Sequence, residues 1–278
     1  MILSGKAQLA GVIGWPVSHS LSPRLHGYWL RQHGIDGAYL PLPVRPEALS
    51  PVIASLAELG FRGINVTIPH KQAVLKLCTK LDPTAERIGA VNTVVFQDGG
   101  LHGSNSDAFG FLENLYQSAP DWRPTAGPAV VLGAGGAARA VIVALLDAGT
   151  PSIHLVNRTL ARAEDLAAEF GDTVHPHPWD DIADAFFGAS LLVNSTSLGM
   201  TGQPPLKLDL TGLPRAALVT DLVYTPLETP LLAAAKARGH SVVDGLGMLL
   251  HQARPGFEAW FGFRPNVTEE LRRFVLAG

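Results

Sequence analysis

One lysine and one aspartate occupy positions that suit acid–base chemistry. Lys71 follows an apolar run at 63–68 and a proline, so we expect it in the first turn of a helix. A cation there opposes the helix dipole, which favours the neutral amine that proton transfer near neutral pH requires. Asp107 precedes a predicted helix over 108–118, and a carboxylate facing Lys71 would make a lysine–aspartate pair. An exposed lysine and a helix-capping aspartate would explain the same spacing.

Further polar side chains follow the other predicted strands. The segment HSLSP (19–23) comes after a strand, and Ser22 followed by Pro23 predicts a helix start with Ser22 as N-cap. One cap is enough, so Ser20 needs another explanation, and hydroxyls beside a helix N-terminus suit a small carboxylate. Asn92 lies inside an apolar strand pattern and therefore needs a polar partner.

A glycine-rich turn marks a second kind of site. The strand AVVL (129–132) runs into GAGGAA (133–138), a G-x-G-x-x-A pattern that lets the backbone approach a pyrophosphate at a helix N-terminus. The next strand ends in NRTLAR (157–162), with no carboxylate to bind a ribose 2′-hydroxyl. Arg158 and Arg162 instead suit a 2′-phosphate, which predicts NADP. A glycine turn without ligand and a solvated helix face are the alternatives.

The elements that position these residues alternate between strand and helix, which is typical of parallel α/β sheet. We predict strands at 9–13, 38–44 and 63–68, then a hairpin formed by AVNTVVF and GLHGS across Gln97-Asp98-Gly99. A proline-containing linker over 120–128 precedes a second alternation, with strands at 129–132, 153–156, 190–194 and 217–221. One helix is expected to follow the strand at 129–132 and to end at Gly149, and further helices are expected over 159–170, 248–261 and 268–276. Two α/β domains flanking a cleft are therefore the predicted fold class.

Composition limits the class of protein. A length of 278 residues favours two domains, and 47% apolar with 16% charged residues excludes a disordered chain. The formal charge of −3 (21 basic minus 24 acidic residues) argues against a dedicated nucleic-acid binder. No run of eighteen apolar residues or signal peptide is evident, so we expect a cytoplasmic protein.

The cysteine and histidine residues give no metal site. Cys78 is the single cysteine, which excludes an internal disulfide and a multi-cysteine metal centre, and we expect it in the core. His175 and His177 are the only close histidine pair, and each precedes a proline that we expect to break a regular strand or helix. We therefore predict no metal.

Nine motifs, in order along the chain, resemble the shikimate dehydrogenase family. They are HSLSP (19–23), NVTIPHK (65–71), GAVNT (89–93), GSNSD (103–107), GAGGAARA (133–140), NRTLAR (157–162), NSTSLGM (194–200), DLVYTPLETPLL (221–232) and GLGMLLHQA (245–253). Each motif alone is weak, whereas nine in order are specific. The chain departs from the family at Gly27, His70 and Ser106, where asparagine, an aromatic residue and threonine are common, and this leaves substrate preference open.

The resemblance implies a role for each matching residue. Lys71 and Asp107 match the catalytic pair. The matching substrate-binding positions are Ser20, Ser22, Thr67, Lys71, Asn92, Asp107, Tyr224 and Gln252. The matching cofactor-binding positions are Gly133, Ala134, Gly135, Gly136, Ala137, Asn157, Arg158, Thr159, Arg162, Thr196, Leu222, Gly245 and Met248. It also implies a substrate domain over 1–106, completed by helices in 247–278, and a Rossmann NADP domain over 107–246.

The expected function is NADP-dependent interconversion of 3-dehydroshikimate and shikimate by a monomer or homodimer. Paired Ser20 and Ser22 favour shikimate, because quinate enzymes of the family often change one of them. The first alternative is a dehydrogenase of quinate or another cyclic polyol. The second is a non-catalytic NADP-binding regulatory module, which the presence of Lys71 and Asp107 disfavours.

Overall fold

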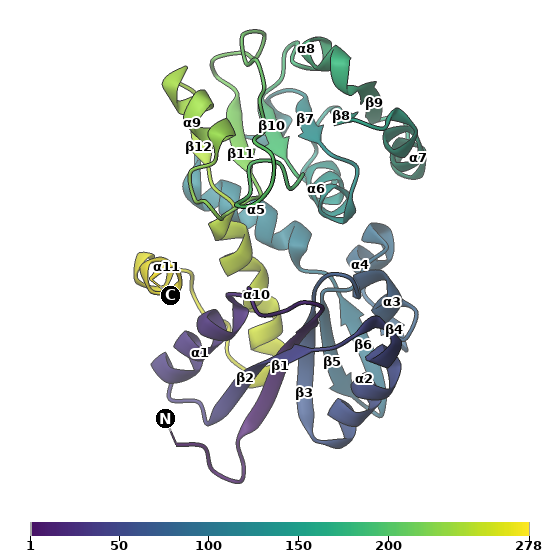
Figure 1. Ribbon diagram of the computed structural model, residues 1–278, viewed down its shortest axis with the longest axis vertical. Coiled ribbons are helices and arrows are strands. Elements are labelled where there is room, and N and C mark those ends of the chain that lie inside the picture. The colour runs from purple at the N-terminus through teal and green to yellow at the C-terminus, as the bar shows by residue number, and fades with distance from the viewer. Residues whose placement is uncertain (1, 278) are drawn as a thin grey trace. The chain divides into compact units, whose positions relative to one another are not determined.

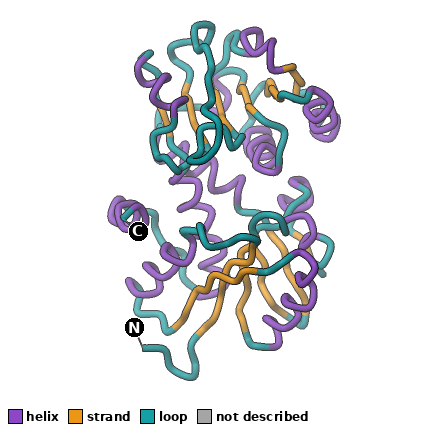
Figure 2. The backbone as a smooth tube through the Cα atoms, in the orientation of Figure 1, coloured by secondary structure: helices purple, strands orange, loops and turns teal. Residues whose placement is uncertain are grey.

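The computed structural model describes residues 2–277, and the chain divides into two compact units (Figure 1). The first unit combines the N-terminal stretch up to Ser106 with the C-terminal stretch from Leu250 onward, and the second unit is Asp107–Leu249. Figure 2 shows the strands of each unit gathered in one sheet with helices beside it. The two-domain α/β fold class predicted from the sequence is confirmed.

The first unit has a six-stranded mixed sheet within the described residues, in the order β2-β1-β3-β5-β6-β4. Its elements are β1 (Gln8–Gly14), α1 (Ser22–Gln32), β2 (Gly37–Pro43), α2 (Leu49–Glu58), β3 (Phe61–Val66), α3 (Lys71–Leu75), β4 (Lys80–Leu81), α4 (Pro83–Ile88), β5 (Thr93–Gln97), β6 (Gly100–Ser104) and α11 (Glu269–Leu276). Strands β1, β2 and β3 are parallel, so their carboxyl ends lie at one edge.

The predicted hairpin is strands β5 and β6, which pair antiparallel. Asp98 and Gly99 both have positive φ angles, of 54° and 72°, as a tight hairpin turn requires. The two-residue strand β4 was not predicted, because its single pairing with β6 leaves no periodic pattern to detect.

Helix α10 (Leu246–Phe261) begins in the second unit, and its residues from Leu250 onward belong to the first unit. Its Trp260 indole Nε1 donates to the carbonyl oxygen of Val94 at 3.0 Å. Gly63 makes room for that ring, because a Cβ at this position would lie 2.2 Å from the indole nitrogen. A glycine in β3 therefore permits the return of the C-terminal helix to the N-terminal sheet.

The second unit has a six-stranded parallel sheet within the described residues, in the order β12-β11-β10-β7-β8-β9. Its elements are α5 (Asp107–Ser118), β7 (Ala129–Leu132), α6 (Gly136–Asp147), β8 (Ile153–Asn157), α7 (Leu160–Phe170), β9 (Val174–Pro178), α8 (Ile182–Ala185), β10 (Leu191–Asn194), β11 (Leu218–Asp221), α9 (Pro230–Ala237) and β12 (Val242–Val243). Numbered from β7, this is the 3-2-1-4-5-6 order of the Rossmann fold.

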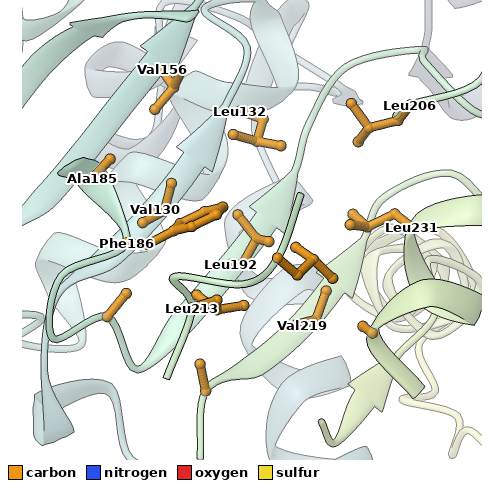
Figure 3. Packing of buried hydrophobic residues seen from close by; sticks show 14 of the residues in the cluster. Val130, Leu132, Val156, Ala185, Phe186, Leu192, Leu206, Leu213, Val219 and Leu231 are labelled. Atoms are coloured by element: carbon orange, nitrogen blue, oxygen red, sulfur yellow. The ribbon is translucent and has the colours of Figure 1, made fainter. Parts of the chain in front are cut away.

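The central strands of this sheet are mostly apolar because helices cover both faces, and polar residues such as Asn194 and Asp221 come at their carboxyl ends. Residues of β7 and β10 are all buried. Figure 3 shows the ring of Phe186, just after α8, packed beside Val130 and Leu192 in one buried cluster. The strands thus end at one rigid edge, from which the loops that carry the predicted cofactor residues leave.

Candidate functional site

The two predicted carboxylate-binding serines lie at the start of α1, but Ser22 is not the N-cap that the sequence suggested. The N-cap of α1 is Leu21, and Ser22 is already the first helical residue. Ser20 accepts a hydrogen bond from the backbone N–H of Ser22 at 3.3 Å. The prediction that Ser22 caps the helix is therefore wrong, because the helix begins one residue earlier and the neighbouring hydroxyl takes the exposed N–H.

Lys71 is the first residue of α3, as predicted. Its backbone is held from both sides: Val91 donates its N–H to the Lys71 carbonyl at 3.0 Å, and the preceding His70 is buried. The His70 ring lies with Nε2 2.7 Å from the Val44 carbonyl oxygen, so Nε2 carries the proton that it donates. Thr67, just after β3, donates its backbone N–H to Ile13 at the end of β1. Lys71 therefore starts from a fixed backbone while its side chain is half-buried.

Asn92 has the polar partners that its sequence environment required. The side chain is 3% exposed. Its Oδ1 accepts from the Ser106 backbone N–H at 3.0 Å, the Ser106 hydroxyl at 3.2 Å and the Thr93 hydroxyl at 2.9 Å. Its Nδ2 donates to Oε1 of Gln252 on α10 at 3.4 Å. The structure thus brings together two predicted substrate-binding residues, and it orients the Asn92 carboxamide from one side.

Two residues of this polar set, Tyr39 and Asn65, were not predicted as site residues. The Tyr39 hydroxyl donates to Asn65 Oδ1 at 2.6 Å, and Asn65 Nδ2 donates to the Asn92 carbonyl at 3.0 Å and to Thr93 Oγ1 at 3.1 Å. Asn65 gave a usable signal, since it is a polar residue among the apolar residues in the second half of β3. Tyr39 gave none, because a tyrosine in a strand is ordinary.

Asp107 and Tyr224 belong to the second unit. Asp107 is the first residue of α5 and is 6% exposed, so its position agrees with the predicted helix start to within one residue. Asn105, two residues earlier, donates its side-chain N–H to the Ala90 carbonyl at 2.8 Å. Tyr224 lies on the loop after β11, and burial raises the pKa of its hydroxyl.

The glycine-rich turn connects β7 to α6 and leaves open space beside the N-terminus of the helix. Gly133 has φ +101°, and a Cβ there would lie 2.8 Å from Cγ2 of Thr196. Gly135 is the N-cap of α6, and a Cβ on Gly135 or Gly136 would meet nothing within 4 Å. The helix N-terminus therefore opens onto free space, which suits an anion. Ala134 and Ala137 complete the predicted turn and are half-buried.

The end of β8 carries the two arginines predicted for a 2′-phosphate. Arg158 and Arg162 are exposed, and Asn157 folds the loop by donating to the Thr159 carbonyl at 2.8 Å. Thr159 occupies the N-cap position of α7 but makes no side-chain capping bond. The guanidinium groups thus stand in solvent at the carboxyl end of the strand next to β7, where Rossmann proteins bind the adenosine ribose.

The loops after β10 and β11 are joined through the buried carboxylate of Asp221. It accepts hydrogen bonds from Asn194 Nδ2 at 2.9 Å, the Val223 backbone N–H at 3.0 Å and the Thr229 hydroxyl at 2.7 Å. Asn194 in turn accepts from the hydroxyl of Thr196 at 2.7 Å. Burial raises the pKa of Asp221, and the three donors oppose that shift.

The remaining predicted cofactor residues lie at the same sheet edge. A Cβ on Gly245 would come 2.3 Å from the Leu222 carbonyl oxygen, so this close backbone approach requires glycine. Met248 lies in the first turn of α10 and is half-buried. The structure therefore collects Gly133, Thr196, Leu222 and Gly245 around the carboxyl ends of β7, β10, β11 and β12.

The expectation that Pro176 and Pro178 break regular structure is wrong. Strand β9 spans Val174–Pro178 at the edge of the sheet, where a proline removes no hydrogen bond that a further strand would need. The pairing with β8 places His177 Nε2 2.8 Å from His154 Nδ1, close enough for a direct hydrogen bond. Among the described residues no group of three histidine, cysteine, aspartate or glutamate side chains has a metal-binding arrangement. Cys78 is half-buried rather than a full core residue, and burial raises its pKa to about 11.

No described helix is both long and apolar enough to cross a membrane. The Rossmann-order sheet and the open glycine turn are typical of one class of protein, the two-domain α/β proteins that bind dinucleotides. Comparison with known proteins narrows this class.

Three family models match consecutive parts of the chain. They are the shikimate dehydrogenase substrate binding domain (residues 12–94), shikimate / quinate 5-dehydrogenase (123–200) and the shikimate 5′-dehydrogenase C-terminal domain (245–269). A shikimate dehydrogenase (NADP(+)) of Paramagnetospirillum magneticum is 63% identical over 99% of this chain and 100% of its own. The chain belongs to the shikimate dehydrogenase family.

Solved structures agree with this assignment. The shikimate 5-dehydrogenase of Thermus thermophilus, in complex with NADP(H) and shikimate, is 40% identical with a TM-score of 0.87 over 97% of this chain and 99% of that one. A quinate dehydrogenase of Corynebacterium glutamicum in complex with NAD is 31% identical, with a TM-score of 0.90 over 98% of this chain and 99% of that one. The fold is thus shared by enzymes of more than one substrate and cofactor.

Proposed function

We propose that this protein catalyses the reversible, NADP-dependent reduction of 3-dehydroshikimate to shikimate, a step of aromatic amino-acid biosynthesis. The observation that carries the substrate is the 63% identity, over nearly the whole chain, to an NADP-dependent shikimate dehydrogenase. The cofactor choice is supported by the end of β8, where Arg158 stands and a ribose-binding carboxylate does not.

In this proposal, the two structural units divide the work. Residues 1–106, completed by helices in 247–278, bind the substrate, and residues 107–246 bind NADP. Ser20 and Ser22 hold the substrate carboxylate. Thr67, Asn92, Tyr224 and Gln252 bind the ring hydroxyls, and this is supported for Asn92 and Gln252 by the hydrogen bond that joins them.

The residues present fit a dinucleotide. The open space at Gly135 and Gly136 accommodates a pyrophosphate against the N-terminus of α6, which spans 12 residues. Arg158 and Arg162 supply paired N–H donors to the 2′-phosphate. The further cofactor contacts are Gly133, Ala134, Ala137, Asn157, Thr159, Thr196, Leu222, Gly245 and Met248. Bound NADP supplies or accepts a hydride at its nicotinamide C4.

The chain's own contribution to the reaction is the movement of one proton. In the reducing direction, Lys71 delivers a proton to the oxygen at substrate C3 as that oxygen gains charge, and in the reverse direction it removes this proton. Asp107 pairs with Lys71, orients the ammonium and stabilises its charged form. The serines and carboxamides hold the ring so that C3 is presented correctly.

We further propose that the enzyme works in the cytoplasm as a monomer or homodimer, without a nucleic-acid partner. The net charge of −3 supports the last point, because nucleic-acid binders usually carry a basic excess.

Initial rates with shikimate and quinate, each with NADP⁺ and NAD⁺, test the proposal. We expect the highest kcat/KM for shikimate with NADP⁺. A preference for quinate would favour the cyclic-polyol alternative, for which the Corynebacterium glutamicum neighbour gives a structural precedent. Absence of turnover with every cyclic hydroxy acid, combined with normal NADPH binding, would favour the regulatory module.

A further inference from the structure

A continuous chain of hydrogen bonds begins at Tyr39 and ends at Gln252. The Tyr39 hydroxyl donates to Asn65 Oδ1. Asn65 Nδ2 donates to Thr93 Oγ1, and the Thr93 hydroxyl donates to Asn92 Oδ1. Asn92 Nδ2 then donates to Gln252 Oε1. The last two members are proposed substrate contacts, whereas the first three have no assigned role.

The direction of this chain is fixed at its first links. Asn65 Nδ2 also donates to the backbone carbonyl of Asn92, which is an acceptor only. The amide nitrogen of Asn65 must therefore face Asn92 and its oxygen must face Tyr39. Tyr39 consequently has to donate its proton to Asn65, and a phenylalanine in its place would leave that oxygen without its donor.

The ring of Tyr39 is itself held in place by an unusual neighbour. His26 of α1 stacks on it with parallel planes and a centroid distance of 3.9 Å. His26 is completely buried, and neither ring nitrogen has a hydrogen-bond partner among the described residues. Leaving two polar atoms unpaired costs free energy, so packing must favour this ring here. Trp29, Phe257 and Trp260 surround it at centroid distances of 5.8 Å.

A second contact joins Tyr39 to the proposed carboxylate site. Burial raises the pKa of Tyr39 well above its ordinary value, and a hydrogen bond with the Ser22 side chain opposes that rise. Tyr39 therefore lies between Ser22, at the start of α1, and the Asn65–Asn92 carboxamides, at β3 and β5. One phenol connects two groups that are proposed to hold opposite parts of the same substrate.

We propose that Tyr39, clamped by His26, is a positioning residue of the substrate site that orients the Asn92 and Gln252 carboxamides through Asn65. This inference rests on the proposed function, because it assumes that these carboxamides contact shikimate. Tyr39 sets the geometry of binding and takes no part in proton or hydride transfer.

The test is Tyr39→Phe, with Tyr28→Phe as the matched control. Tyr28 is also a buried tyrosine of the first unit, but it packs against Phe274 of α11. Loss of one hydrogen bond corresponds to about a three- to tenfold change in affinity. We expect Tyr39→Phe to raise KM for shikimate by about that factor, with kcat within about twofold and KM for NADP⁺ unchanged. Tyr28→Phe leaves all three constants unchanged.

A double-mutant cycle separates positioning through Asn65 from a merely structural role. In an Asn65→Ala background, Tyr39→Phe is expected to raise KM for shikimate by a smaller factor than in wild type, because only its contact with Ser22 is left to lose. If Tyr39→Phe yields too little folded protein, Thr93→Val interrupts the same chain two links on with little change of shape, and it must also raise this KM. Melting temperatures of all variants are compared with wild type.

Several results would overturn the inference. One is an unchanged KM for shikimate in Tyr39→Phe or Thr93→Val. Another is that Tyr39→Phe raises KM for shikimate equally with and without Asn65. A third is that Tyr39→Phe raises KM for NADP⁺ as much as KM for shikimate. Wild-type enzyme is assayed first. If it oxidises shikimate while Tyr39→Phe behaves like it, only the positioning role fails. If wild type does not oxidise shikimate, the proposed function fails and this inference fails with it.

Discussion

In the first unit Asn92 is held by the side chains of Thr93, Ser106 and Gln252, whereas in the second unit the turn at Gly133–Gly136 is shaped by the backbone itself. The first arrangement fixes polar atoms in one orientation and suits a small, densely hydroxylated ring. The second leaves open space and a helix N-terminus, which suits any pyrophosphate. Under the proposed function, we expect substrate specificity to depend on side-chain contacts and general dinucleotide affinity to depend on the path of the backbone. The following experiments test this contrast.

The largest expected effect is that of Lys71→Ala, in the first unit. General acid–base catalysis typically contributes about 10²–10⁴-fold, so we expect kcat to fall by about that factor while KM for shikimate changes far less. Lys71→Arg is not expected to rescue activity, because a guanidinium does not give up its proton. Stopped-flow and steady-state assays measure kcat and KM for both variants. A near-normal kcat in Lys71→Ala would leave Asp107 or water as the acid–base group.

The buried histidine of the first unit is expected to make that unit sensitive to acid. Burial lowers the pKa of His26, in the first unit, from 6.5 to about 3. Below pH 6.5 the unfolded chain therefore binds more protons at this residue, and the first unit loses about 1.4 kcal/mol of stability per pH unit down to about pH 3. In the second unit, burial raises the pKa of Asp221, which adds stability as pH falls through this raised value. Burial lowers the pKa of His154 and His177 in the same unit, and these two residues remove stability as pH falls below 6.5.

Amide hydrogen exchange, corrected for intrinsic rates and resolved by peptide, measures the acid dependence of each unit. His26→Phe should flatten the acid dependence of the first unit between about pH 6 and pH 4 and leave the second unit unchanged. The slope, not the absolute stability, is the readout, because phenylalanine also changes packing. Identical slopes in wild type and His26→Phe would show that other groups govern acid unfolding.

Arg158→Ala tests the side-chain part of the second unit. A charge-assisted hydrogen bond contributes roughly 1.5–3 kcal/mol, so NADPH binding should weaken about ten- to hundredfold. NADH binding should change little, since NADH lacks the 2′-phosphate. Dissociation constants from fluorescence titration give both numbers. Equal losses for the two cofactors would place the 2′-phosphate elsewhere and weaken the proposed NADP preference.

A pair of glycine substitutions sharpens the backbone part of the contrast. In Gly133→Ala the new methyl group would clash with Thr196, and alanine would have to adopt a positive φ. The free energy of unfolding should therefore fall by about 1–3 kcal/mol, and the melting temperature should fall with it. Gly135→Ala meets nothing within 4 Å, so the fold should tolerate it. Its methyl group occupies the proposed pyrophosphate space, so the affinities for NADPH and NADH should fall by similar factors. Unchanged cofactor affinity in Gly135→Ala would move the pyrophosphate away from this turn.

The sequence by itself determined those features that depend on neighbouring residues. Alternating apolar runs gave the two α/β units, Gln97-Asp98-Gly99 gave the hairpin turn, and Pro69 placed Lys71 in the first turn of a helix. The glycine turn after 129–132 was also evident, because glycine and proline restrict or release the backbone locally.

Only the tertiary structure decided the contacts between distant segments. Asn92 and Gln252 are 160 residues apart, and Tyr39 and Asn65 are 26 apart on different strands. Strand β9 forms because it pairs with β8, although its two prolines had predicted no regular strand. The N-cap of α1 is Leu21 rather than the predicted Ser22, and the Ser20 hydroxyl accepts a hydrogen bond from the Ser22 N–H. Local propensity does not encode strand register or helix docking, since these follow from which arrangement buries the most apolar surface and pairs the buried polar atoms.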